Sequence, residues 1–407
     1  MNARIYKKLA SLAIKVGINL QKGQDVVIYI STRQDKLAKI LVEECYLSGA
    51  RTVTVEWKNE DIGKLHYLYQ DEKTLKKIEP WIIGKEKYRS KQVPCLIHVL
   101  DDDPDILSSL DIEKVSKAMI ARRSAIKKYR DIVDNINQWT IIAVPSASWA
   151  KKVYPNLKEK EAIKRLWLDI IKCSRLEGDP IKNWDNHIKY LAAKADILNK
   201  LDLSYLHYKS SNGTDLKLKL HPLYTFISAR ETNLRGISFS ANIPTEEVFS
   251  MPDKYGVDGI VYSSKPLSYN SMLIQDFYLK FENGKVVEAK AKVGQDVLLE
   301  ILNTDEGSSY LGEVALVPYS SPVNKCGVLF YETLFDENAC CHLALGQAFK
   351  NNFRNYENMS EEDFKKNNYN DSLIHVDFMI GTSDLQIDGY KKDGTKITIF
   401  ENGSWAI

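Results

Sequence analysis

The first half of the chain alternates short apolar runs with amphipathic stretches, and this alternation constrains the fold more than any other feature. Buried parallel strands have continuous apolar sequences of this kind. After the first run, apolar residues recur at helical spacing until Gly49. Strand–helix–strand order predicts an open α/β domain with a mainly parallel sheet. The four predicted strands are residues 25–30, 52–57, 95–100 and 140–145.

The pattern changes after a charged, helical stretch at residues 157–200. Asn212-Gly213 and Asn283-Gly284 are hairpin turn signals, and the leucines of residues 216–220 alternate with lysines. The second half is therefore predicted to be a strand-rich α+β domain. A length of 407 residues suits two domains of roughly 200 residues each. We place them at residues 1–200 and 201–407.

Composition excludes several classes of protein. Lys and Arg number 56 and Asp and Glu 54, so the chain lacks the basic excess of a general nucleic-acid binder. No stretch of about 18 consecutive apolar residues predicts a membrane span, and the N-terminus does not resemble a signal peptide. The six cysteines are scattered without a CxxC pair, which is typical of reduced thiols and predicts a cytoplasmic location. The first half also lacks the glycine-rich loops that bind nucleotide phosphates.

The run Asp101-Asp102-Asp103 follows a predicted strand and precedes Pro104. Three carboxylates at the end of a strand can hold a cation. Aspartate before proline is more often the cap of a helix that starts at the proline, and we favour that interpretation.

Residues 372–381 combine an apolar strand pattern with two ionisable side chains. Alternate side chains of a strand share a face, so His375 and Asp377 would lie together. Buried ionisable groups need partners, and a metal ion is one such partner. Hydrogen bonding inside a core is an equally good explanation for this segment alone. The opposite, apolar face would consist of Ile374, Val376, Phe378 and Ile380.

Three further segments place acids or histidine in unusual settings. Glu313 lies within an apolar strand pattern, where glutamate is rare unless the position faces solvent at an edge. His342 lies in an apolar, helix-like run, where a core role is the alternative. Glu246 and Glu247 follow Pro244 in a loop and would by themselves be an exposed pair. Together these carboxylates and imidazoles suit Zn, Co or Mn.

Four motifs, in this order, resemble the M29 family of metallo-aminopeptidases. They are NIPTEEVF, LGEVALV, LFDENACCHLALG and HVDFMIGT. The resemblance runs along the whole chain. It implies a two-domain fold, two divalent metal ions in the C-terminal domain, and usually a homodimer. It also implies hydrolysis of the N-terminal residue from peptides with a free N-terminus, by water whose pKa the two ions lower.

The resemblance also implies roles for individual residues. Glu313 would bridge both ions, and Glu337 is a further candidate ligand, with a helix N-terminal acid as its alternative. Glu246 is the candidate catalytic general base, although an acid behind the ligands or a salt bridge is the more common role. The implied ligands are Glu247, Glu313, Glu337, His342, His375 and Asp377.

Phe349 departs from the family pattern, which places a tyrosine seven residues after the ligand histidine. A hydroxyl able to stabilise the oxyanion is missing there, and Tyr356 is a possible substitute at a different backbone position. The departure places the catalytic rate in question more than metal binding. It makes a catalytically weak relative that binds peptides one alternative function. The other is a metallohydrolase of another class, such as a phosphoesterase, that uses the same ligand types.

Overall fold

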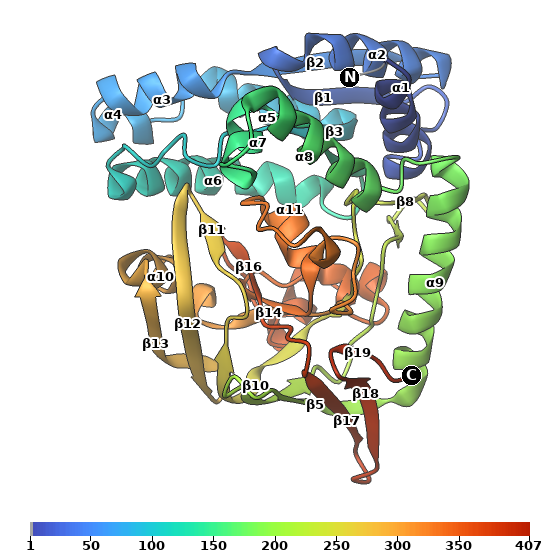
Figure 1. Ribbon diagram of the computed structural model, residues 1–407, viewed down its shortest axis with the longest axis vertical. Helices are drawn as coiled ribbons and strands as arrows, with labels where there is room; N and C mark the ends of the chain where they lie inside the picture. Colours follow the sequence, from blue (N-terminus) through green and yellow to red (C-terminus); the bar gives the residue numbers. More distant parts are fainter. Residues whose placement is uncertain (1–2) are drawn as a thin grey trace. The chain divides into compact units, whose positions relative to one another are not determined.

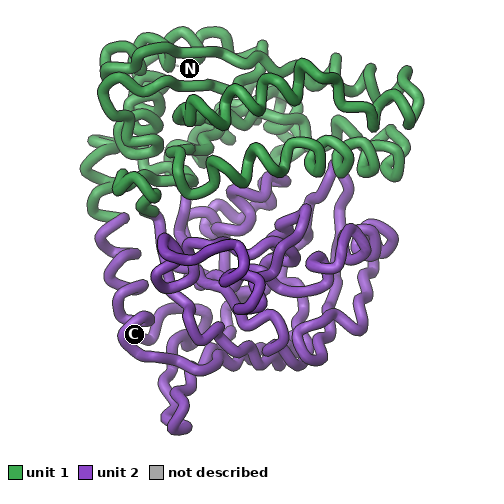
Figure 2. The backbone as a smooth tube through the Cα atoms, turned by 180° about the vertical axis from the view of Figure 1, so that it is seen from behind, with its two compact units in different colours: residues 1–187, 230–244 green, residues 188–229, 245–407 purple. Residues whose placement is uncertain are grey.

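The computed structural model describes residues 3–407, which form two compact units (Figure 2). The first unit contains the described residues up to His187 and residues 230–244, and the second contains residues 188–229 and 245–407. Each unit is built around its own sheets, which are described separately below.

A parallel sheet of four strands in the order β2-β1-β3-β4 organises the first unit (Figure 1). The strands are the four apolar runs of the sequence. Strands β1, β3 and β4 contain buried residues, whereas the residues of the edge strand β2 are half-buried or exposed. The α/β prediction for the N-terminal half is therefore confirmed. The elements are α1 (Ala3–Leu12), η1 (Ala13–Gly17), β1 (Asp25–Ser31), η2 (Thr32–Gln34), α2 (Asp35–Leu47), β2 (Thr52–Lys58), α3 (Glu60–Tyr69), α4 (Glu72–Lys76), α5 (Pro80–Gln92), β3 (Cys95–Leu100), α6 (Ile112–Val133), β4 (Trp139–Ala143), α7 (Ala147–Val153), α8 (Glu159–Cys173), the start of α9 (Pro180–Leu201), β7 (Glu231–Thr232) and β8 (Ser238–Phe239).

The helix predicted to start at Pro104 is absent from the described chain, and α6 begins only after Asp111. Asp111 is the N-cap, and its side chain accepts a hydrogen bond from the backbone of Lys114. Asp101 is buried at the end of β3, where Gln34 donates to it at 3.0 Å and Arg33 forms an ion pair at 3.5 Å. The favoured helix-cap interpretation of this run was therefore wrong.

Residues 230–244 group with the first unit although they follow α9 in sequence. Asn242 forms a parallel bridge with Ile141 of β4, and Thr140 donates from its side chain to the Ser240 carbonyl at 2.9 Å. These contacts attach the segment to the edge of the parallel sheet. The division by contacts therefore differs from the single boundary predicted at residue 200, because strand pairing does not follow chain order.

The second unit is mainly antiparallel, with one large sheet and one small sheet (Figure 1). The small sheet, in the order β16-β15-β14-β9, carries the candidate site. The strand-rich prediction for the C-terminal half is confirmed. The elements are β5 (Leu203–Lys209), β6 (Asp215–Leu220), β9 (Val248–Ser250), β10 (Pro252–Tyr262), β11 (Leu267–Tyr269), β12 (Met272–Glu282), β13 (Lys285–Val293), α10 (Gln295–Leu302), η3 (Gly307–Ser309), β14 (Leu311–Leu316), η4 (Asn324–Cys326), α11 (Thr333–Asp336), η5 (Glu337–Ala339), β15 (His342–Gly346), η6 (Lys350–Asn352), η7 (Tyr356–Asn358), α12 (Glu361–Lys366), β16 (His375–Met379), β17 (Gln386–Lys391), β18 (Lys396–Glu401) and β19 (Ser404–Trp405).

Local sequence explains the strands of the large sheet well. The leucines of β6 are buried and its lysines exposed, as the alternation predicts. Asn283-Gly284 joins β12 to β13, with Glu282 paired to Lys285 and Asn283 at a positive φ of 49°. The predicted alternation of β6 and the predicted turn at Asn283-Gly284 are both confirmed.

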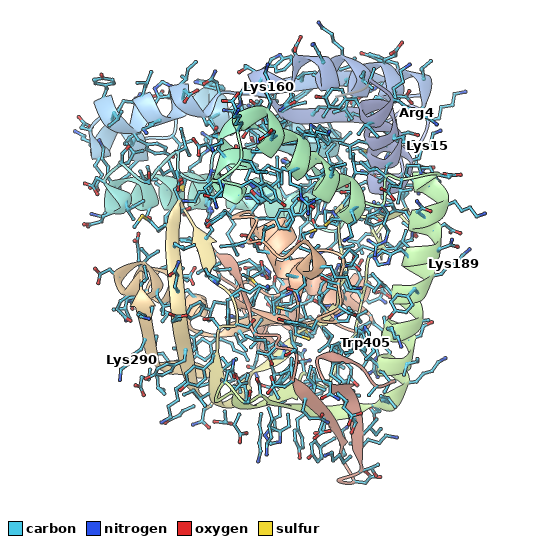
Figure 3. The ribbon with its side chains drawn as sticks, viewed as in Figure 1. Arg4, Lys15, Lys160, Lys189, Lys290 and Trp405 are labelled. Atoms are coloured by element: carbon cyan, nitrogen blue, oxygen red, sulfur yellow. The ribbon has the colours of Figure 1, made fainter. Side chains whose placement is uncertain are left out.

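Some lysines of the second unit lie on its surface. Lys189 on α9 and Lys290 on β13 point outward (Figure 3). Within residues 3–407, no helix combines the length and the apolarity that a bilayer span requires.

Candidate metal centre

The register of the small sheet brings two of the predicted residues into one row. Ala344 of β15 pairs with Glu313 of β14 on one side and with Asp377 of β16 on the other. Paired residues of antiparallel strands point to the same face, so the two carboxylates lie on the same face as the small Ala344 side chain, one on each side of it. His342 is two residues from Ala344, and His375 two residues from Asp377. All four ionisable side chains therefore share one face.

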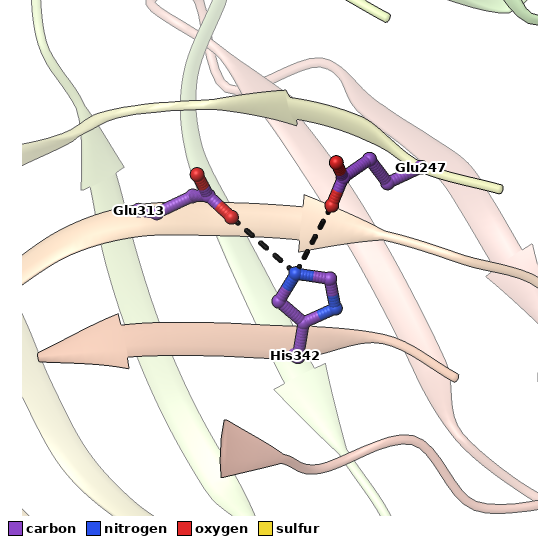
Figure 4. A group of neighbouring side chains, drawn as sticks. All are labelled: Glu247, Glu313 and His342. Atoms are coloured by element: carbon purple, nitrogen blue, oxygen red, sulfur yellow. Dashed lines mark ion pairs between the residues drawn. The ribbon is translucent and has the colours of Figure 1, made fainter. Parts of the chain in front are cut away.

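Two groups of possible ligand atoms result, and Glu313 belongs to both. In the first group, the His342 Nε2 atom lies 3.2 Å from Glu247 Oε2 and 3.3 Å from Glu313 Oε1 (Figure 4). In the second, the His375 Nε2 atom lies 3.1 Å from Asp377 Oδ1 and 3.9 Å from Glu313 Oε2. In each group the ligand atoms lie within 4.8 Å of one another. The two oxygens of Glu313 thus face different histidines.

The structure decides several alternatives that the sequence left open. Glu313 is buried with 4% of its surface exposed, so it does not face solvent at a sheet edge. Glu246 and Glu247 are also buried, and the exposed loop pair expected from their sequence was wrong. His342 begins strand β15, so the helix-like interpretation of its run was wrong as well. The strand is buried along its whole length, which removes the alternation that normally identifies a strand.

Backbone carbonyls orient both imidazole rings. The Nδ1 atom of His375 lies 2.7 Å from the Gln347 carbonyl, and that of His342 lies 3.4 Å from the Cys340 carbonyl. A carbonyl only accepts hydrogen bonds, so Nδ1 of His375 carries a proton. In a neutral ring the Nε2 lone pair then faces the carboxylates. Hydrogen bonds of this kind fix the tautomer of histidines that bind metals.

Without metal, Glu313, His342 and His375 hold protons more tightly than they would in water, as their pKa shifts show. Burial raises the pKa of Glu313 to about 7, against the lowering effect of His342. Burial alone would lower the pKa of His375, but the charge of Asp377 and the bond to it raise that pKa to about 9. The pKa of His342 is likewise raised, because Glu247 and Glu313 outweigh the effect of burial. Protons therefore hold together carboxylates that would otherwise repel one another.

The donor set fits a divalent cation. The Nε2 atom of His342 is buried, and neither of its contacts to the carboxylates has hydrogen-bond geometry, so among the described residues it has no hydrogen-bond partner. Carboxylate oxygens surround an imidazole nitrogen in both groups. Mixed oxygen and nitrogen donors of this kind suit Zn, Co or Mn.

Glu246 and Glu337 are buried nearby but belong to neither group. Burial raises the pKa of Glu337 well above its usual value, and the charges of Asp377 and Glu247 raise it further. The negative charges of acids from both groups therefore act on Glu337, although Glu337 itself belongs to neither group. The backbone N–H of Glu246 donates to the Asn338 side chain at 2.7 Å.

Comparison with known proteins identifies the family to which the chain belongs. The family model described as thermophilic metalloprotease (M29) matches residues 2–405. The chain belongs to the M29 metalloprotease family. Aminopeptidase AmpS of Bacillus subtilis is 43% identical over 98% of this chain and 97% of its own length. Aminopeptidase T of Thermus thermophilus is 36% identical over 99% of both chains, and the structure of wild-type AmpT matches with a TM-score of 0.91 over 100% of both chains. The protein is a metallo-aminopeptidase that acts on peptides.

Phe349, the predicted departure from the family pattern, lies beside the candidate site. Its ring centroid is 4.7 Å from that of His375, with the planes tilted by 46°, and it meets Phe249 edge to face at 5.9 Å. The ring is half-buried. Tyr356 instead packs against the apolar cluster formed by Met251, Phe353 and Phe364.

We expect Phe349→Tyr to raise kcat at constant metal content. If the new hydroxyl donates to the developing oxyanion, kcat should rise by on the order of 100-fold, which is the effect of one such donor. Steady-state kinetics, elemental analysis and a melting curve measure the effect. Phe353→Tyr is the matched control, because it adds the same hydroxyl within the apolar cluster. An unchanged kcat with a lowered melting temperature would contradict the expected role, since a buried unsatisfied hydroxyl costs about 1–3 kcal/mol.

Some residues that shape the site were missed from the sequence. Asn338 contacts Glu246 and Glu337, and the Gln347 carbonyl orients His375. Asn338 lies inside one of the four motifs, which is the only signal that pointed to it. A backbone carbonyl has no sequence signal, because every residue has one.

Proposed function

We propose that this metallo-aminopeptidase uses two divalent metal ions held by two ligand groups that share Glu313. Glu247, Glu313 and His342 would hold one ion, and Glu313, His375 and Asp377 the other. The observation that carries the proposal is the position of Glu313, whose two oxygens face different histidines. Glu337 lies in neither group, so its role as a further ligand stays a prediction.

Two bound ions would lower the pKa of water at the site and polarise the peptide carbonyl. Zn, Co and Mn all suit the donor set. The burial of the carboxylates supports the proposal, since water that would screen their charges is largely excluded from them.

Glu246 is the proposed general base. It is buried beside Glu247, and its carboxylate is not needed in either ligand group. Its carboxylate would take a proton from the attacking water and give it to the leaving amine nitrogen as the carbon–nitrogen bond breaks. The acidic surroundings would also favour the positively charged N-terminus of a peptide.

Blocking the substrate's N-terminus tests the proposal. N-acetylation of an aminoacyl p-nitroanilide should reduce kcat/KM by on the order of 100-fold or more, because a site built for a polar group rejects a substrate that leaves its partner unpaired. The two compounds are compared at equal enzyme and metal concentrations. Equal turnover of both would point to an endopeptidase, and turnover of p-nitrophenyl phosphate instead would point to a phosphoesterase.

A homodimer is the assembly that the family resemblance predicts, and a cytoplasmic location is what the cysteines predict. Both stay predictions.

A further inference from the structure

Asn338 lies between two of the buried acids and bonds to both of their segments. Its side chain is fully buried. The Oδ1 atom accepts from the backbone N–H of Glu246 at 2.7 Å, across 92 residues of chain. The Nδ2 group donates to the Leu334 carbonyl at 2.9 Å and to Glu337 Oε1 at 3.3 Å. One amide therefore joins the loop of Glu246 and Glu247 to the turn that carries Glu337.

The chemistry of the partners requires an amide at this position. A backbone N–H only donates, whereas a carbonyl and a carboxylate oxygen accept, so the partners fix the orientation of the Asn338 amide. Aspartate would place an oxygen against the Leu334 carbonyl and the Glu337 carboxylate. Leucine would leave the Glu246 N–H buried without a partner. Asparagine supplies a donor and an acceptor on one short planar group.

We propose that Asn338 is a positioning residue that holds the Glu246–Glu247 loop and Glu337 in place at the metal centre. The bond from Glu246 fixes the backbone one residue before Glu247, whose carboxylate lies 3.2 Å from His342. The proposal rests on the two-metal site proposed above. Residues that orient metal ligands commonly change metal affinity by about 10–100-fold when they are removed.

Metal titration of the full chain tests the proposal. Asn338→Ala should weaken Zn²⁺ binding by about 10–100-fold, measured by calorimetry or by competition with a chromophoric chelator. More metal should also be needed for half-maximal hydrolysis. Asn338→Ser is the milder variant if alanine prevents folding, because a hydroxyl can satisfy one of the buried partners.

Asn199 provides a matched control in the same unit. Its side chain also accepts from a backbone N–H, that of Phe226 at 2.8 Å, and donates to the Phe226 carbonyl at 2.9 Å. Asn199→Ala should lower the melting temperature without changing metal affinity. A purely structural role for Asn338 would make the two alanine variants alike.

The outcomes separate this inference from the function on which it rests. If the wild-type chain binds no metal, the proposed metal centre itself is wrong. If the wild type binds Zn²⁺ and Asn338→Ala binds it equally well, the positioning role is overturned, whatever the variant's activity. Weakened binding in Asn338→Ala with unchanged binding in Asn199→Ala supports the role.

Discussion

Glu313→Gln is expected to reduce kcat/KM by on the order of 1000-fold, the upper end of the cost of removing one group that stabilises the transition state. The effect should be this large because Glu313 is the only residue shared by the two ligand groups among the described residues. An amide has one acceptor oxygen and no charge, so it cannot face both histidines in the same way. Elemental analysis should show fewer bound metal ions per chain than in the wild type.

Asp336→Asn is the matched control for this variant. Asp336 is also a buried carboxylate of the second unit, and burial raises its pKa to about 7. Its oxygens accept from the backbone N–H groups of Phe330 and Glu332, and it belongs to neither ligand group. The control should retain its metal. A Glu313→Gln protein with full metal content and wild-type kinetics would rule out a shared ligand.

Removal of metal by a chelator is expected to abolish hydrolysis, and added Zn, Co or Mn should restore it. The ligands must lose their protons before metal binds, so the affinity should depend on pH. Burial opposes the positive charge of His375, but Asp377 raises its pKa to about 9, and the proton must leave before Nε2 can bind a metal. Reconstitution should therefore need less metal at pH 9 than at pH 6.5. Full activity in chain shown to be free of metal would contradict the two-metal mechanism.

The same proton gives the metal-free chain a stability that depends on pH. The pKa of His375 is higher in the folded chain than its usual value of 6.5, so the folded state holds the proton more tightly. The contribution is fully present below pH 6.5 and is lost as the pH rises towards 9. Melting curves of the metal-free chain at pH 6.5 and at pH 9 measure the loss of this contribution to the stability of the fold.

The sequence by itself determined the features that depend on neighbouring residues. The apolar runs of the parallel strands, the leucine–lysine alternation of β6 and the Asn283-Gly284 turn all follow from local backbone and side-chain preferences. His375 and Asp377 were placed on one face from the period of a strand, and their side chains do meet at 3.1 Å. The family motifs identified the acids and histidines that the sheet brings together.

Only the tertiary structure decided how these residues meet. Glu313 and Asp377 face each other across Ala344 because of strand register, and register depends on pairing between segments far apart in the chain. The same pairing buries β15 along its length, so its sequence resembled a helix. The role of Asn338 depends on a bond across 92 residues. Contacts of this kind arise from packing, which a local sequence pattern does not encode.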